Sequence, residues 1–570
     1  MAFLGFATRL AIVAATVRTA LSNAFRGTAQ VQSQSMRLEV LRAAMLDELM
    51  VGLGHGNRVT QERLQSIEEA LRPMFNSLPK NQHGNLEHTA VRYALHRLFV
   101  LRHGMFVKGL EPGGEAWDSA SATDILDDRV PSYVQSLFES RLEGHGLGLH
   151  EVAILAATLE HLIHDEATDR LRTAYEVNNV ALDQHCDGPK VRKVIDTYMV
   201  MFLLGVNSSQ SSHAAIVEHR AAILRVYPSW PQSQKFTREV QREVVEAHAN
   251  DEAFAPGRLT FNATAKIVEE IMERYGRWQD IECRDLKTAL MQLEDKDTGR
   301  VLLKDFYGSA KGGAWQFTES VDYLRDLGAL DESNAQRPGV LIANYVNSHS
   351  NCLASSGLYS ICCLNECEPL LGHIEREIGA PDAPPERVLE LVSALPSSTV
   401  QAPRELPAEL AQLLEQVAGH HNGRVPLHGR LFSQWMHHAF PRECPFPHRV
   451  GTTKPMTANE WINERGSVPH ASEMEMQLHI MSENTSHDIG SDNPSNTDSK
   501  QLLWTVEEEL VVSTTAPPTR LISSWFHPIV AVGALVSMAW TLLMSWQPLS
   551  KLFGQRKANV LPFAGKAHYC

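Results

Sequence analysis

The segment LKTALMQLEDKDTGRVLLKDF, residues 286–306, carries the pattern from which the fold is predicted. Leu286, Leu290 and Leu293 recur at the spacing of one helix face. Gly299 then interrupts a polar stretch before a second apolar run begins. The segment therefore predicts two helices joined by a tight turn.

Helical spacing of apolar residues recurs along most of the chain. It is clearest in the series Leu64, Ile67, Leu71, Met74; Val152, Leu155, Leu159; and Ile267, Ile271, Tyr275. The apolar stretch 191–204 is short for a membrane span and predicts a buried helix. Because the chain lacks a glycine-rich phosphate loop and a run of alternating strands, the predicted fold class is mainly α.

Segment 286–306 resembles an EF-hand. With Gly299 at loop position 6, Glu294 takes position 1, Val301 the apolar position 8 and Asp305 position 12. In an EF-hand the oxygens of this loop replace water around calcium, but here Lys296 occupies position 3. The resemblance implies a degenerate calcium loop with the candidate ligands Glu294, Thr298, Arg300 and Asp305.

Three further segments have a similar outline. They are 79–90, which has almost no charged oxygen ligands, 144–152, and 331–345, whose loop is too long for the standard spacing. Together with 286–306 they predict two EF-hand-like pairs, in 58–165 and 266–346. Unrelated helix–turn–helix units with a glycine in the turn are the alternative. Calcium is the one cofactor indicated.

A region rich in cysteine and histidine follows the second pair. Four of the eight cysteines lie in NCLASSGLYSICCLNEC, residues 351–367. The candidates for disulfides are Cys352, Cys362, Cys363, Cys367 and Cys444. Because a bridge between Cys362 and Cys363 would be strained, these two are expected to reach different partners. The alternatives are a metal site that adds His428, His437, His438 or His448, and a cysteine nucleophile.

The strongest membrane signal is WFHPIVAVGALVSMAWTLLMSW, residues 525–546, which contains no charged side chain. Trp525 and Trp546 would lie about 31 Å apart on a helix, with Trp540 between them. A basic, acid-free tail follows at 547–570. By the positive-inside rule this predicts a type I protein that contacts the bilayer through 523–546. A buried core helix is the alternative.

The amino terminus predicts a targeting segment at 1–28, either a secretory signal or an organelle transit peptide. A secretory signal agrees with the charge asymmetry at the other end, so the predicted location is the secretory pathway or cell surface. The candidate glycosylation sites are Asn207, Asn262 and Asn484. The net charge of −15, with basic residues concentrated at both ends, excludes nucleic acid as a partner.

The predicted organisation is a targeting segment (1–28), two helical domains (38–210 and 228–346), a Cys/His-rich domain (347–465), a disordered stalk (466–522), a transmembrane helix (523–546) and a cytoplasmic tail (547–570). As a whole the chain resembles uncharacterised single-pass membrane proteins of unicellular algae, which implies no activity. The predicted function is a membrane-anchored ectodomain that binds a protein partner or acts as a scaffold, with a weak calcium response. The alternative is a metal- or thiol-dependent enzyme that uses the cluster 352–448.

Overall fold

The computed structural model describes residues 61–110, 145–206, 211–255, 257–310, 317–353, 355–481 and 503–510. Several predictions concern residues outside these ranges: the targeting segment 1–28, the span 523–546 with Trp525, Trp540 and Trp546, the tail 547–570, Asn207 and Asn484. Among the helices within the described ranges, none combines the length and the apolar character needed to cross a membrane.

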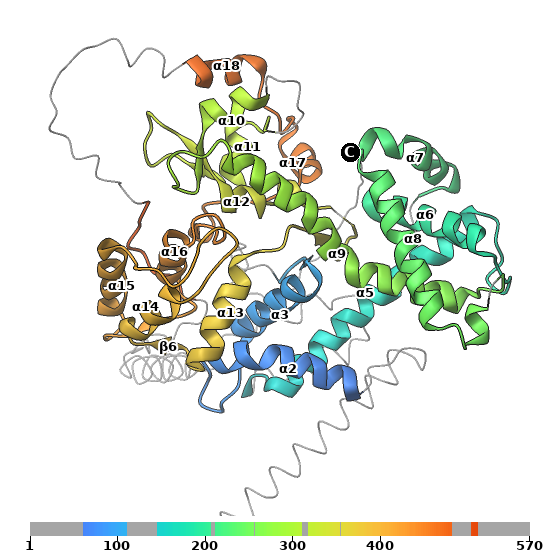
Figure 1. Cartoon of the computed structure of the whole chain (residues 1–570), viewed down its shortest axis with the longest axis horizontal. Coiled ribbons are helices and arrows are strands. Elements are labelled where there is room, and N and C mark those ends of the chain that lie inside the picture. Colours follow the sequence, from blue (N-terminus) through green and yellow to red (C-terminus); the bar gives the residue numbers. More distant parts are fainter. Residues whose placement is uncertain are drawn as a thin grey trace, which may run out of the picture. The chain divides into compact units, whose positions relative to one another are not determined.

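The described part of the chain is mainly helical, as predicted (Figure 1). The helices are α2 (Gln61–Ser77), α3 (His88–His103), α5 (Leu149–Val177), α6 (Gly188–Leu203), α7 (His213–Val226), α8 (Trp230–Ala247), α9 (Phe261–Met291), α10 (Leu303–Ala310), α11 (Val321–Asp326), α12 (Ile342–Val346), α13 (Cys367–Ile378), α14 (Pro385–Ser393), α15 (Ala408–His420), α16 (Arg430–Ala439), α17 (Ala458–Arg465) and α18 (Glu473–Met481). Two short 3-10 helices are η2 (Glu252–Phe254) and η3 (His349–Asn351).

The strands are short and antiparallel. They are β1 (Met105–Val107), β2 (Arg300–Leu302), β3 (Leu330–Asp331), β4 (Gly339–Leu341), β5 (Tyr359–Ile361), β6 (Asp382–Ala383) and β7 (Val425–Pro426). Strand β1 pairs with β5, β4 lies between β2 and β3, and β6 pairs with β7.

A repeated contact organises the described helices. Four times, two loops that each precede a helix meet in an antiparallel bridge that contains a pair of buried residues. The pairs are Leu86–Leu147, Cys186–Leu259, Val301–Val340 and Ala383–Val425. None of the eight residues is more than 4% exposed. Helix α5 runs from the first loop pair to the second, and α9 runs from the second to the third. Continuous helices therefore link the first three loop pairs.

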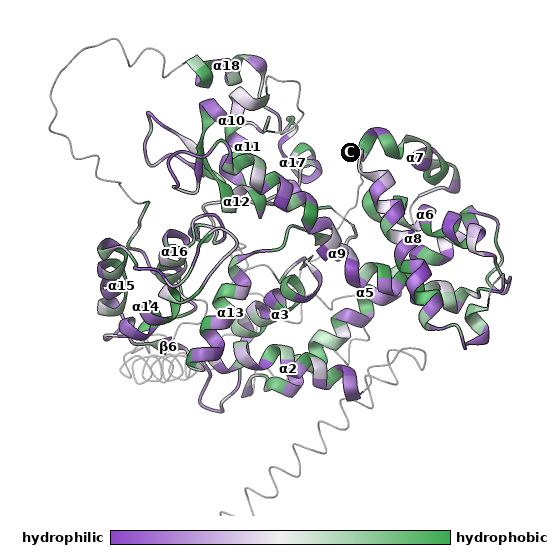
Figure 2. Ribbon diagram, viewed as in Figure 1, coloured by the Kyte–Doolittle hydropathy of each residue, from purple (hydrophilic) through white to green (hydrophobic). Residues whose placement is uncertain are grey.

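The helix α9 shows how the sequence produces this arrangement. It begins at the N-cap Thr260, whose hydroxyl accepts a hydrogen bond from the Ala263 N–H. Its residues Ile267, Ile271 and Tyr275 are fully buried. Figure 2 shows polar and apolar residues alternating along the helices, as expected where one face is buried.

The helix α9 also spans two hydrophobic cores. Tyr275, in its middle, belongs to a core that includes Leu64 and Phe236, whereas Leu290, near its end, belongs to a core that includes Val301. A third core lies within residues 370–444. The predicted boundary between 38–210 and 228–346 therefore does not separate two cores, because both sides of it contribute to the first.

The prediction of a buried helix at 191–204 is confirmed by α6. Val191, Met199 and Phe202 are fully buried. The stretch is apolar on nearly all sides because α6 is covered by α5, α7 and α8. Its apolar character therefore reflects a core position.

The prediction of a disordered stalk over 466–522 is wrong for two parts of it. Residues 473–481 form α18, and residues 503–510 lie along α16. In the second part, Gln434 donates a hydrogen bond to the Thr505 carbonyl and accepts one from the Thr505 N–H. Helix α18 has apolar residues on its exposed face as well as on its packed face, and 503–510 is held by hydrogen bonds, so neither segment shows a one-sided apolar period.

Candidate functional site

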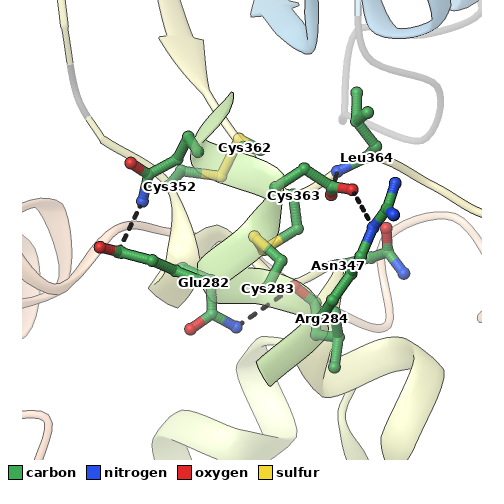
Figure 3. Close-up of a disulfide and its surroundings, with 12 residues drawn as sticks. Glu282, Cys283, Arg284, Asn347, Cys352, Cys362, Cys363 and Leu364 are labelled. Atoms are coloured by element: carbon green, nitrogen blue, oxygen red, sulfur yellow. Dashed lines mark hydrogen bonds and ion pairs between the residues drawn. A yellow bond between two sulfur atoms is a disulfide. The ribbon is translucent and has the colours of Figure 1, made fainter. Parts of the chain in front are cut away.

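The described cysteines of the predicted cluster form disulfides. Cys352 is bonded to Cys362 and Cys363 to Cys283 (Figure 3), and a third disulfide joins Cys367 to Cys444. Disulfides of this kind fit an oxidising compartment, in agreement with the prediction of a secretory or extracellular location.

The adjacent cysteines reach different partners, as predicted. Cys362 and Cys363 follow strand β5, where successive side chains point to opposite sides. Cys362 therefore meets Cys352, whose neighbour Leu353 pairs with Ile361, while Cys363 meets α9 (Figure 3). The partner Cys283 was not among the predicted candidates.

One sequence signal identifies Cys283 in retrospect. It lies on the same buried face of α9 as Lys287 and Leu290, at a helical spacing of four and three residues. The other described cysteine, Cys186, is buried in the bridge with Leu259 and is not in a disulfide.

The histidines of the region do not converge on one point. His437 contacts the Cys444 carbonyl at 2.7 Å, His438 the Leu503 carbonyl at 2.9 Å, and His448 the Gly328 carbonyl at 2.7 Å. Across the residues that the structure describes, no three His, Cys, Asp or Glu side chains are grouped to hold a metal. All five predicted cysteines of the cluster 352–448 are thus bonded in disulfides.

The loop at 294–299 has the turn that the sequence predicts. Gly299 has a φ of +74°, and its N–H donates a 2.6 Å hydrogen bond to the Glu294 carboxylate. A Cβ atom at Gly299 would approach the Pro441 Cβ and carbonyl oxygen to 2.6 Å. Glycine is thus required twice, by the positive φ and by the close approach of Pro441.

Arg442 places a guanidinium on the acidic side of this loop. Its Nε and Nη2 lie 2.8 and 2.7 Å from one Glu294 carboxylate oxygen, and Nη2 lies 2.5 Å from Asp297. Asp295 is paired with Arg337 at 3.2 Å. Burial alone would lower the pKa of Arg442, but its bonds to Glu294 and Asp297 raise it. The loop therefore already contains a cation that belongs to the protein.

The other predicted calcium ligands have different surroundings. Thr298 donates a hydrogen bond to the Asp295 carbonyl at 2.6 Å. Arg300 forms an ion pair with Asp331 at 2.6 Å. Asp305 lies in the first turn of α10. Glu294 and Thr298 thus interact within the loop, while Arg300 links it to strand β3.

A buried charge network connects α3 to the third core. The side chain of Arg97, 1% exposed, contacts Glu368 and Glu375 of α13 at 2.5 Å each. Its guanidinium lies over the Tyr93 ring, 5.3 Å from the centroid. His428 approaches Glu375 at 3.4 Å and the Tyr93 hydroxyl at 3.3 Å. The contacts of Arg97 with Glu368 and Glu375 join segments more than 270 residues apart in the chain.

The protonation states in this network follow from burial and the central arginine. Burial would raise the pKa of Glu375, but the charge of Arg97 lowers it below its usual range. Burial dominates at Glu368 and raises its pKa despite Arg97. Burial lowers the pKa of His428 to about 4, so this histidine is neutral at pH 7.

A second buried network links α9 to the segment around the Cys367–Cys444 disulfide. The Lys287 ammonium lies 2.9 Å from Glu366 and 3.3 Å from Glu443. Glu443 also accepts hydrogen bonds from Ser398 at 2.9 Å and from the Thr399 hydroxyl at 2.7 Å. Burial would raise the pKa of Glu443, but Lys287 and these hydroxyls lower it. A disulfide and a charge network thus hold the same segment.

His103 lies between carboxylates of two helices. It is 3.4 Å from both Glu160 on α5 and Glu273 on α9, and Arg63 on α2 pairs with Glu160 at 2.9 Å. Burial would lower the pKa of His103, but hydrogen bonds to the two carboxylates raise it. Burial would raise the pKa of Glu273, which His103 and Arg63 instead bring to about 2.

We expect His103→Asn to cost less stability at pH 9 than at pH 5.5. Because the folded-state pKa of His103 lies above its ordinary 6.5, its contribution is present below pH 6.5 and is lost as the pH rises through the folded pKa. The difference should be at most about 1 kcal/mol, since Glu273 is half exposed and screened by water. Urea unfolding at both pH values measures it, with the exposed His213→Asn as control. A larger cost at pH 9 would contradict the expectation.

A pocket of about 350 Å³ opens beside β1 and α17. Its wall includes Phe106 and Met456 and two ion pairs, Lys108–Glu460 at 3.3 Å and Lys454–Glu464 at 2.6 Å. Because the charges cancel within the wall, the pocket has no excess charge with which to select an ion.

Asn262 is exposed in the first turn of α9, as a glycosylation site requires, while Thr264 of the same triplet is buried and bonded to Tyr175.

The features described above hold remote segments of the chain together. They are the disulfides, the buried ion pairs, and the loop occupied by an arginine. Comparisons with protein-family models, curated proteins and solved structures found no match to this chain.

Proposed function

We propose that this chain is a binding or scaffolding protein built from EF-hand-like pairs that hold their shape without calcium. The helix–loop–helix order, the glycine turn at Gly299 and the pairing of Val301 with Val340 support the EF-hand resemblance. The observation that carries the proposal is the position of Arg442, whose guanidinium occupies the acidic side of the loop.

Rigidity without calcium fits a scaffold better than a sensor. A calcium sensor must change shape when its loop is filled, and the loop of a sensor is therefore vacant in the resting state. Here Arg442 pairs with Glu294 and Asp297 of the loop, and Cys444, two residues later, is fixed to α13 by a disulfide. The third core is thereby attached to the second helix pair.

The proposal includes a type I membrane anchor at 523–546, supported by the apolar sequence and the basic tail. We expect the protein to stay in the membrane pellet after a carbonate wash. Its release into the wash would remove the anchor from the proposal and leave the ectodomain part unchanged. A soluble lumenal protein released by the same wash serves as control.

We expect the unmodified chain to give no saturable heat with millimolar calcium, and Arg442→Ala to gain weak binding. Removal of the guanidinium frees Glu294, but with few charged ligands the affinity should not exceed that of extracellular EF-hands, with Kd of about 10⁻⁴–10⁻³ M. Isothermal calorimetry measures both proteins.

The double variant Arg442→Ala/Glu294→Gln is the matched control and should lose the gained binding. Arg325→Ala, which removes an exposed arginine from the ion pairs with Asp322 and Glu332, tests for a general effect of charge. Saturable calcium binding by the unmodified chain that Glu294→Gln abolishes would overturn the proposal.

A further inference from the structure

The segment 467–481 folds back onto the second helix pair. The Ser320 N–H donates to the Pro469 carbonyl at 2.8 Å, and the Ala471 N–H donates to the Thr318 carbonyl at 2.7 Å. The Glu475 carboxylate accepts a 2.9 Å hydrogen bond from the Val321 N–H at the start of α11. Two backbone hydrogen bonds thus hold the residues before α18, and one hydrogen bond to a carboxylate holds α18 itself.

The helix α18 then covers apolar surface. It packs mainly against α10 (Figure 1), and its Met476 and Ile480 contact the core that contains Phe306 and Tyr307. The ring of His479 lies 5.8 Å from that of Tyr307. Met476 and Ile480 are four residues apart, so one helix face supplies the apolar contact.

The helix α18 is less buried than its neighbours α10 and α17. None of its residues is buried, and Met474, Leu478 and Met481 are 82%, 68% and 62% exposed. A helix of nine residues is not stable by itself in water. By contrast, the preceding α17 is anchored by Trp461, which is 5% exposed. The helix α18 therefore has the features of an element that opens locally while α17 stays in place.

A hinge for this opening lies between α17 and α18. Gly466, the C-cap of α17, has a φ of +64°, and the chain turns there towards α18. Rotation at Gly466 would release 467–481 and leave the Tyr323–Trp461 ring contact unchanged.

We propose that the surface covered by α18 is a docking site for an amphipathic helix of a partner protein, and that residues 467–481 are its built-in occupant. The partner helix presents two apolar side chains four residues apart and a carboxylate directly before the first, in the positions of Met476, Ile480 and Glu475. This inference rests on the proposed function as a binding protein and gives it a site and a partner chemistry.

The experiment uses a fluorescent peptide of residues 466–481 and the full chain carrying Met476→Asp/Ile480→Asp. The substitutions place charges on the inner face of α18 and release it, so the added peptide should bind, seen as a rise in anisotropy. The unmodified chain should bind the peptide at least about tenfold more weakly, because its own α18 competes at millimolar effective concentration.

The matched control is Met474→Asp/Leu478→Asp, which changes the exposed face of the same helix. This variant should keep α18 docked and bind the peptide no better than the unmodified chain. The peptide with the inner-face substitutions should bind none of the proteins. Glu475→Ala provides a milder release, with an intermediate gain in binding, for the case that the double variant does not fold.

Absence of peptide binding to both Met476→Asp/Ile480→Asp and Glu475→Ala would overturn the docking site. Equal binding by the outer-face control would do the same. Hydrogen exchange of the amides of 473–481 as slow as that of α10 in the unmodified chain would show a permanent contact and would also overturn it. These readouts do not involve loop 294–299, so they are independent of the calcium experiment.

Discussion

Replacement of Arg97 by methionine is expected to destabilise the protein by about 3–5 kcal/mol. Among the described residues, the guanidinium is the cation that pairs with Glu368 and Glu375, because His428 beside Glu375 is neutral at pH 7. Because Arg97 and Glu375 are almost fully buried, removal of the arginine leaves charge that water cannot reach. Urea unfolding measures the loss: the midpoint should fall while the slope of the free energy of unfolding against urea concentration stays constant.

The controls separate buried charge from a lost side chain. Arg274→Met removes a half-exposed arginine that pairs with Glu243 and Glu270, and should cost less than about 1 kcal/mol. Addition of Glu368→Gln and Glu375→Gln to the Arg97 variant should recover part of the loss, because the unpaired charges disappear. A cost for Arg97→Met as small as that for Arg274→Met would show that the network is not buried as described.

The second large effect is expected from the disulfide between Cys283 and Cys363. It closes a sequence separation of 80 residues, whereas the Cys352–Cys362 bridge closes one of 10. From the entropy of the unfolded chain, loss of the long-range bridge should cost ~4.5 kcal/mol and loss of the short one ~2.7 kcal/mol. The double variants to serine, unfolded without reductant, measure the difference.

Peptide mapping without reduction provides the control on connectivity. Each double variant should lose one cross-linked peptide and keep the other two. An equal or larger cost for the short bridge would contradict the expected order. Free thiols at Cys283 and Cys363 in the unmodified chain would exclude the pairing itself.

The helices were largely predictable, because burial on one face leaves a period in the sequence. The series Ile267, Ile271, Tyr275 and the apolar stretch 191–204 both correspond to buried helices. The loop pairs Cys186–Leu259 and Ala383–Val425 were not predicted, although Gly257 and Gly423 precede Leu259 and Val425 by two residues with a positive φ, as Gly299 precedes Val301.

The candidate site was predictable only where chemistry restricted neighbouring residues. Strain in a bridge between Cys362 and Cys363 required different partners for them, which the structure confirms. Spacing did not identify Cys283 as a partner, since a disulfide can join residues at any separation. The stalk prediction was partly wrong for a related reason: α18 and 503–510 are held by contacts with residues remote in the chain, which the local sequence does not reveal.

The sequence by itself determined that the chain is mainly helical, that the turn at Gly299 needs a glycine, and that the cysteines of 352–367 are suited to disulfides. These properties depend on the backbone and on residues close in the chain. The tertiary structure alone decided that Arg442 occupies the loop beside Glu294 and that Arg97 is buried with Glu368 and Glu375. The physical reason is that electrostatic pairing acts through space and depends on burial, and the partners are about 150 to 280 residues apart in the sequence.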